Sequence, residues 1–179
     1  MSRDGFDENL KWGAEAEIWV AAWLMRRGWR ILPTYDFSGK DDDKAPRLAA
    51  VRPADSLVIP DLLSARGGTS RWVEVKRKTR ADLYRKTGVL ETGISRRLWT
   101  HYHKTQQATG IEVWIAFVHD VEGEVRVRSI DDLNALPPRE YLGTKMGRDG
   151  MVFFPWEQLL LLTTVEECRA EYIRQQDAA

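Results

Sequence analysis

The chain has 179 residues, of which 43% are apolar and 30% charged, and it contains a single cysteine, Cys168. This length and composition predict one globular domain, and they exclude a largely disordered chain, a disulfide framework and a zinc site built on cysteines. The longest apolar run, 18–25, is too short for a membrane span, and the N-terminus lacks the apolar stretch of a signal peptide. We therefore expect a soluble, cytoplasmic protein.

The net charge is zero, but the charges are unevenly distributed along the chain. Residues 71–110 carry 10 basic and 3 acidic side chains, whereas residues 111–179 carry 7 basic and 13 acidic ones. A concentrated basic segment is typical of a surface that binds a polyanion, although a solvated Lys/Arg face would give the same pattern. Charge alone does not separate these two interpretations.

The predicted elements alternate between helices and strands. Helices are expected over 13–28, 96–109 and 164–176, with a helical turn over 131–136 and a short helix that begins at Pro155. Strands are expected over 29–32, 57–63, 71–76, 112–119, 124–129 and 151–154, and loops over 36–56 and 139–150. The α-β-β-β-α-β order, with helices after it, predicts an α/β (α+β) domain around a central mixed β-sheet flanked by helices.

We expect residues 1–135 to form the core of this domain, with 36–56 as an inserted loop. Residues 136–179 would add a C-terminal loop and helical extension to the same domain.

The most informative residues lie on two neighbouring strands. If the chain turns at Gly67–Gly68, Asp61 and Glu74 face each other across an antiparallel hairpin, and Lys76 projects from the same face as Glu74. Two carboxylates in that position repel each other, and a divalent cation between them would reverse the effect. Oxygen ligands favour Mg²⁺, with Mn²⁺ as the alternative. The alternative is a surface hairpin with an ordinary Glu–Lys pair and no metal site.

A third carboxylate comes from the first helix. Glu17 shares the inward face of that helix with Val20, Ala21 and Leu24. Since a buried carboxylate needs a partner, the metal site or the Lys76 ammonium would serve. A glutamate placed near the helix N-terminus by the helix dipole is the competing explanation.

These residues carry a resemblance to a known family. The order Glu17, Pro60-Asp61, Glu74-x-Lys76, a polar helix and the strand 113–118 resembles the PD-(D/E)XK nuclease superfamily, whose members share a restriction-endonuclease-like core. The segment Gly13-x-x-x-Glu17 and the following residues up to Leu32 are similar to the start of the small Holliday-junction-resolvase-like branch. The resemblance covers about residues 12–130.

The resemblance implies Mg²⁺-dependent hydrolysis of phosphodiester bonds in DNA, including branched or structured DNA. Asp61 and Glu74 would be metal ligands, Lys76 the catalytic lysine, and Glu17 an accessory carboxylate that orders the metal or its water. Because enzymes of the resolvase-like branch commonly act as dimers, it also implies a homodimer. The segment before the second strand is longer than in the smallest resolvases.

The basic helix after the hairpin favours contact with nucleic acid. The candidate residues for contact with the phosphate backbone are Lys78, Arg96, Arg97, Tyr102, Lys104 and Gln106. Any one of these side chains is more commonly an ordinary solvated surface residue, so the prediction rests on the group.

Two other functions remain open at this point. One is a non-catalytic nucleic-acid-binding or assembly module that retains the nuclease fold, and the other is a nuclease directed at RNA. The sequence offers no feature that recognises the 2′-hydroxyl group of RNA. The binding module would be favoured if Lys76 were locked away from solvent in an ion pair, or if the candidate side chains diverged in space.

Overall fold

The structure is a computed structural model, and it describes residues 3–34, 47–48, 57–136, 139–141 and 150–178. The helices are α1 (Arg3–Arg26), α2 (Arg96–Thr109), α3 (Ile130–Ala135), α4 (Val165–Asp177) and the short 3-10 helix η3 (Trp156–Gln158). The strands are β1 (Arg30–Pro33), β2 (Arg47–Leu48), β3 (Leu57–Val58), β4 (Leu62–Arg66), β5 (Thr69–Lys78), β6 (Asp82–Tyr84), β7 (Val89–Ser95), β8 (Glu112–His119), β9 (Glu124–Ser129), β10 (Arg139–Tyr141), β11 (Met151–Pro155) and β12 (Leu160–Thr164).

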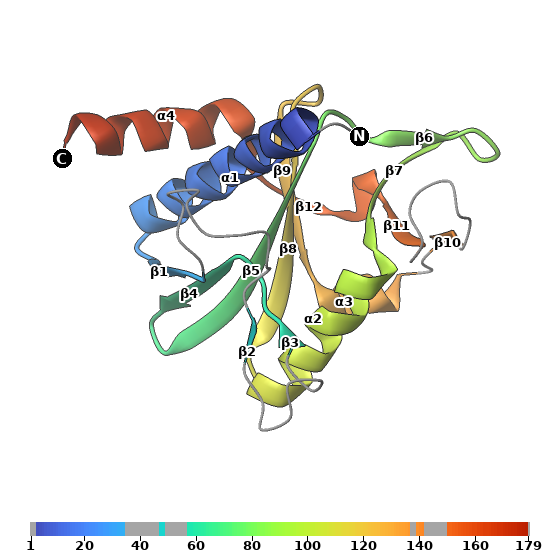
Figure 1. The fold of residues 1–179 in the computed structure, drawn as a ribbon, viewed down its shortest axis with the longest axis horizontal. Coiled ribbons are helices and arrows are strands. Elements are labelled where there is room, and N and C mark those ends of the chain that lie inside the picture. Colours follow the sequence, from blue (N-terminus) through green and yellow to red (C-terminus); the bar gives the residue numbers. More distant parts are fainter. Residues whose placement is uncertain (1–2, 35–46, 49–56, 137–138, 142–149, 179) are drawn as a thin grey trace.

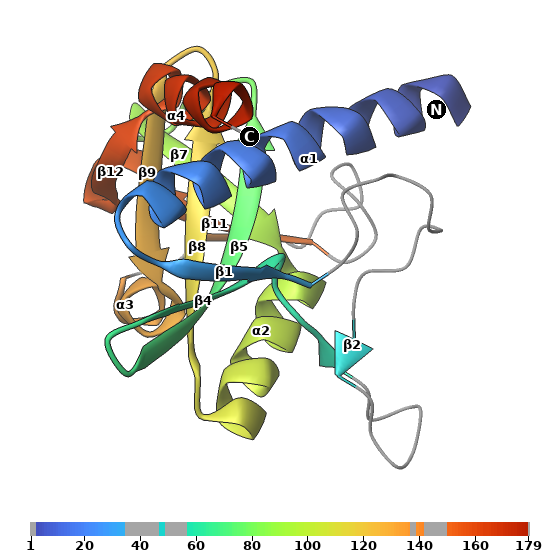
Figure 2. The same ribbon diagram turned by 90° about the vertical axis from the view of Figure 1, so that its left-hand side faces the viewer.

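A six-stranded mixed sheet forms the centre of the molecule (Figure 1). Its strand order is β1-β4-β5-β8-β9-β12, and β5 and β8 are its parallel pair. Helices α1 and α4 cover one face of this sheet and α2 and α3 the other, as Figures 1 and 2 show. A second sheet, β10-β11-β7-β6, lies beside α2. The expected α/β class with a mixed sheet flanked by helices is therefore confirmed.

The central sheet separates two apolar cores because side chains alternate along its strands. On β5, Trp72 packs into the core under α2, whereas Val73 and Val75 pack into the core under α1 and α4. Both cores are continuous with buried residues of β8, whose Ile115 and Ala116 lie on opposite faces. This alternation fixes which β5 side chains reach each face.

The predicted hairpin between β4 and β5 has the expected register. Arg66 lies opposite Thr69 and Leu62 opposite Val73, so the turn falls at Gly67–Gly68. Both glycines have positive φ values, 55° and 81°, which a two-residue hairpin turn of this kind requires.

Helix α2 begins and ends at the expected residues. The Ser95 hydroxyl accepts a hydrogen bond from the Leu98 amide at its start, and Gly110 ends it with a φ of 66°. Helix α4 begins at the expected capping box, where the Thr164 hydroxyl accepts from the Glu167 amide.

Several elements differ from the prediction. Helix α1 begins ten residues earlier than expected, at Arg3, and the predicted strand 57–63 is interrupted between β3 and β4. The hairpin β6–β7 and the edge strand β12 were not predicted, so the C-terminal segment contributes strands as well as helices. Most of the predicted loops 36–56 and 139–150 lies outside the described residues, but Arg47–Leu48 and Arg139–Tyr141 form short strands.

Among the described residues, no helix combines the length and the apolar character needed to cross a membrane.

Candidate active site

The candidate site forms where β4 stops pairing with β5. The last pair of this ladder is Leu62–Val73, so the β5 residues that follow have no β4 partner. The Asp61 side chain takes the place of the missing strand, because its Oδ2 accepts a hydrogen bond of 2.7 Å from the Val75 amide. The carboxylate of Asp61 is thereby fixed against β5 beside Glu74 and Lys76.

Thr34, just after β1, holds the bend that carries Asp61. Its amide donates to the Asp61 carbonyl oxygen at 3.0 Å, and its hydroxyl lies 2.9 Å from the carbonyl oxygens of Pro60 and Asp61. Thr34 was not among the predicted site residues. Its contribution depends on the pairing of β1 with β4, which no local pattern around residue 34 shows.

Glu74 and Lys76 project from the same face of β5 and form an ion pair. The Glu74 side chain is 2% exposed, whereas that of Lys76 remains 30% exposed. Lys76 is therefore paired but still open to solvent, which is the arrangement that a residue acting on an incoming substrate needs. The buried Tyr102 of α2 also hydrogen bonds to the Glu74 carboxylate.

Glu17 reaches the same point from α1. Its side chain faces inward as predicted, since the residue is only 8% exposed. Burial, reinforced by the negative charge of Glu74 and opposed by Lys76, raises the pKa of Glu17 from 4.5 to about 7. The competing explanation, a glutamate favoured near the helix N-terminus by the helix dipole, does not fit, because α1 begins at Arg3 and Glu17 lies well inside it.

Arg77 attaches α1 to β5 next to the site. Its guanidinium group contacts the rings of both Trp12 and Trp19, 4.6 and 4.5 Å from their centroids. It also donates to the Trp12 carbonyl and pairs with Glu15 and Asp120. These contacts hold the helix that carries Glu17 across the strand that carries Glu74 and Lys76.

The electrostatics of the site show an excess of negative charge. Burial and the neighbouring Glu74 raise the pKa of Asp61 well above its ordinary value, although Lys76 and the Val75 amide act against this. Burial alone would lower the pKa of Lys76, but Glu74 and Asp61 outweigh it and raise this pKa. Three carboxylates thus share one ammonium group.

The donor atoms at this point are those that a hard divalent cation takes. One carboxylate oxygen of Glu17 and one of Glu74, both Oε2, are buried and have no hydrogen-bond partner. Such atoms are costly to bury, and a cation would satisfy them. Within the described parts of the chain, no three His, Cys, Asp or Glu side chains stand in metal-binding geometry. The two orphaned oxygens are therefore the atoms of this site that are left without a partner and could bind a cation.

The predicted nucleic-acid contacts separate into two groups. Arg96, Arg97 and Lys104 are exposed on α2, and the half-buried Lys78 at the end of β5 has its pKa lowered by burial. For Tyr102 the predicted contact with a phosphate backbone is wrong, because the residue is 2% exposed and its hydroxyl serves Glu74.

The structure gives Gln106 a role within the fold. Its side-chain oxygen accepts from the Val113 amide at 2.8 Å, and its nitrogen donates to the Asp131 carboxylate at 2.9 Å. Both ends of the amide are used within the fold, so Gln106 joins α2 to β8 and α3. The spacing of Leu98, Tyr102 and Thr105 marks the inward face of α2 and was the signal for the burial of Tyr102.

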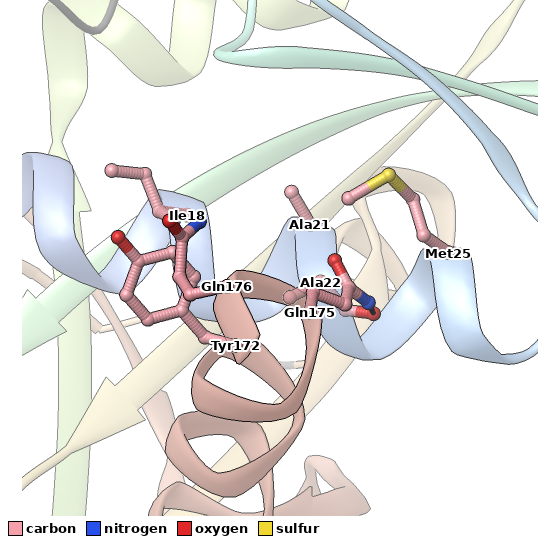
Figure 3. Close-up of a pocket in the computed structure, with 7 residues that line it drawn as sticks. All are labelled: Ile18, Ala21, Ala22, Met25, Tyr172, Gln175 and Gln176. Carbon is pink, nitrogen blue, oxygen red and sulfur yellow. Dashed lines mark hydrogen bonds between the residues drawn. The ribbon is translucent and has the colours of Figure 1, made fainter. Parts of the chain in front are cut away.

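A shallow apolar hollow lies elsewhere, between α1 and α4 (Figure 3). Its lining residues are Ile18, Ala21, Ala22, Met25, Tyr172, Gln175 and Gln176. None of the four candidate catalytic residues lines it.

Comparison with solved structures gives the fold an independent reference. Hjc, a Holliday junction resolvase from the archaeal hyperthermophile Archaeoglobus fulgidus, matches with a TM-score of 0.52 and 13% identity over 84% of this chain and 91% of that chain. D212, a nuclease from a fusselovirus, matches with a TM-score of 0.45 and 12% identity over 99% of this chain and 96% of that chain. No family model and no curated protein matches the sequence. At this level of identity the comparison concerns the fold, and it confirms the expected resemblance there: the chain has a fold like that of the archaeal resolvase.

Proposed function

We propose that this protein is a metal-dependent nuclease that hydrolyses phosphodiester bonds in DNA, with branched DNA as its favoured substrate. The observation that carries the proposal is the pair of buried, unpartnered Oε2 atoms of Glu17 and Glu74 beside Lys76, with the Asp61 carboxylate held against the same strand by the Val75 amide. The resolvase-like fold supports the choice of substrate, because one of the solved structures that it resembles is a Holliday junction resolvase.

In this proposal the unpartnered oxygens of Glu17 and Glu74 would bind Mg²⁺, with Mn²⁺ as an alternative, and Asp61 would join them as the third ligand. A bound Mg²⁺ polarises a phosphate oxygen and makes a coordinated water more acidic. The Val75 amide keeps the Asp61 carboxylate in place, and the Tyr102 hydroxyl does the same for Glu74. Because these supports are buried, the carboxylates are oriented before substrate arrives.

Lys76 acts on the substrate itself. Its raised pKa keeps the ammonium group charged at neutral pH, and its partial exposure leaves it accessible to a phosphate group. A fixed positive charge at this position stabilises the negative charge that develops on the phosphate during attack by water. The exposed cations Arg96, Arg97 and Lys104 on α2 would hold the flanking backbone.

The test is cleavage of labelled duplex, single-stranded and four-way-junction DNA, with matching RNA substrates, in Mg²⁺, Mn²⁺ or EDTA. We expect cutting of DNA in either metal and none in EDTA, with the junction preferred. Glu74→Gln and Lys76→Ala should each lower the rate by about 100-fold or more. Glu171→Gln is the matched control, because Glu171 is a buried glutamate of α4 that pairs with Arg174 instead of lying at the site.

Three outcomes would contradict the proposal. Cutting that persists in EDTA or in Glu74→Gln would rule out this metal site. Salt-sensitive DNA binding without cutting would identify a non-catalytic binding module. Preferential cutting of RNA would change the substrate class.

A further inference from the structure

The hairpin β6–β7 combines features that the proposed catalytic site does not use. It leaves the carboxyl end of β5 and projects beyond the helices and the central sheet (Figure 1). Leu83 and Leu90 lie opposite each other across its two strands, and they are 59% and 37% exposed. Val89 precedes Leu90 and is 39% exposed, but consecutive strand residues project from opposite faces. The two leucines therefore form an exposed apolar pair on one face of the hairpin, and exposed apolar surface of this kind is a feature of interaction sites.

The surroundings of this apolar pair are basic. The turn of the hairpin contains Arg85 and Lys86, and Arg80 precedes its first strand, with all three exposed. In the two-stranded part of the hairpin, the acidic residue that is exposed at the surface is Asp82. A partner that is negatively charged on its outside and apolar within matches this arrangement, and nucleic acid has this combination, because charged phosphates enclose stacked bases.

The base of the hairpin is anchored by a network around the buried His119. Glu122, in the β8–β9 turn, accepts a hydrogen bond from the Ala81 amide, and its other carboxylate oxygen lies 3.3 Å from Nδ1 of His119. Nε2 of His119 lies 3.0 Å from the Thr92 hydroxyl on β7, and the His119 ring stacks on Trp156. The residues entering and leaving the hairpin are thus fixed to the central sheet, and the exposed tip is presented by a rigid base.

We propose that the β6–β7 hairpin is a wedge that inserts Leu83 and Leu90 between bases at a branch or at a junction of single and double strands. Arg80, Arg85 and Lys86 bind the phosphates on either side of the opened step. Inserting apolar side chains into a base step costs the free energy of unstacking, and the bent DNA that results is bound more extensively by the protein. The inference rests on the proposed nuclease function for its choice of partner.

The position of the wedge limits where the strand is cut. Leu83 follows Lys76 by seven residues, so the Cα atoms of the two residues are separated by at most about 23 Å when the chain is fully extended. Successive phosphates of one strand are about 3.4 Å apart along the helix axis. Cleavage should therefore fall within about seven nucleotides of the opened step.

The test uses four-way-junction and duplex DNA that carry 2-aminopurine at the branch or at the matching duplex position. Its fluorescence rises when the base is unstacked, and binding is followed in EDTA so that cutting does not interfere. The variants are Leu83→Ser with Leu90→Ser, which removes the apolar pair, and Arg85→Gln with Lys86→Gln, which removes the turn charges. Leu160→Ser with Leu161→Ser is the matched control, since these leucines of β12 are also exposed.

We expect the wild type and the β12 control to raise the fluorescence at the branch. The Leu83/Leu90 variant should lose most of this rise in fluorescence. Its preference for junction over duplex DNA should fall about tenfold, which is the effect of losing one good apolar contact. The Arg85/Lys86 variant should bind both DNAs more weakly and show a shallower dependence on salt.

An unchanged fluorescence rise in the Leu83/Leu90 variant would overturn the wedge, and so would a wild type that opens no base. If that variant instead loses self-association in sedimentation while base opening is unaffected, the leucines belong to a contact between copies of the chain. Base opening by a wild type that cuts no DNA in Mg²⁺ would retain the wedge and reject the nuclease. Normal cutting without base opening would do the reverse.

Discussion

Replacing Glu17 with glutamine should stabilise the metal-free protein at alkaline pH. In the folded protein the pKa of Glu17 is raised from 4.5 to about 7, first by burial and then by the charge of Glu74. Between these two pH values the folded state holds a proton that the unfolded chain has released. The free energy of unfolding therefore falls as the pH rises through this window, and the loss is complete above pH 7.

The size of the effect follows from the width of the window. Each pKa unit corresponds to about 1.4 kcal/mol, so the ionised Glu17 carboxylate costs about 3 kcal/mol at pH 8. Glutamine keeps the shape of the side chain without the charge. We expect Glu17→Gln to be more stable than the wild type by about 3 kcal/mol at pH 8 and nearly equal to it at pH 4.5.

Urea denaturation in EDTA at several pH values between 4.5 and 8.5 measures this difference directly. Glu15→Gln is the control, because Glu15 lies on the same helix but is exposed, and its ion pair with Arg77 is worth less than about 1 kcal/mol. A Glu17→Gln variant that gains nothing at pH 8, or whose gain does not shrink toward pH 4.5, would refute the assignment of Glu17 as a buried carboxylate under repulsion.

Two further predictions concern residues that hold the site together. Arg77→Met should lower the free energy of unfolding, measured by urea denaturation, by about 2 kcal/mol. The loss is smaller than for a fully buried ion pair, because the partner Glu15 is exposed. An unchanged midpoint would show that α1 does not depend on Arg77. Gln106→Ala should lower it by about 1–3 kcal/mol, since the Val113 amide loses its acceptor, while DNA affinity stays within twofold in a gel-shift assay. A large loss of DNA affinity with normal stability would restore Gln106 as a nucleic-acid contact.

The sequence was sufficient to predict the hairpin that carries the site, and the reason is local. Two adjacent glycines define a two-residue turn, and an antiparallel register then follows for every pair up to Leu62 and Val73. The inward direction of Glu17 followed from helical spacing in the same way. Both predictions need only the periodicity of a single element or of two elements joined by a tight turn.

The hairpin β6–β7 was missed because its pattern is set by a distant strand. Gly93 interrupts β7 and normally argues against a strand. In the fold, a Cβ atom at this position would lie 2.7 Å from the Val152 carbonyl oxygen of β11, so the close pairing of β7 with β11 requires glycine there. The physical cause lies about sixty residues further along the chain, beyond the reach of local pattern analysis.

The arrangement of the site explains why its charges could not be evaluated from the strand pattern alone. An Asp61 paired directly across from Glu74 would have been an ordinary cross-strand repulsion on a regular sheet. The ladder instead stops at Leu62, and the free Val75 amide takes the Asp61 carboxylate as its acceptor. Glu17 of α1 adds a third carboxylate near Glu74, whose charge contributes to the raised pKa of Glu17. The termination of one strand therefore places the Asp61 carboxylate beside Glu74, and a cation would relieve the repulsion among the three carboxylates.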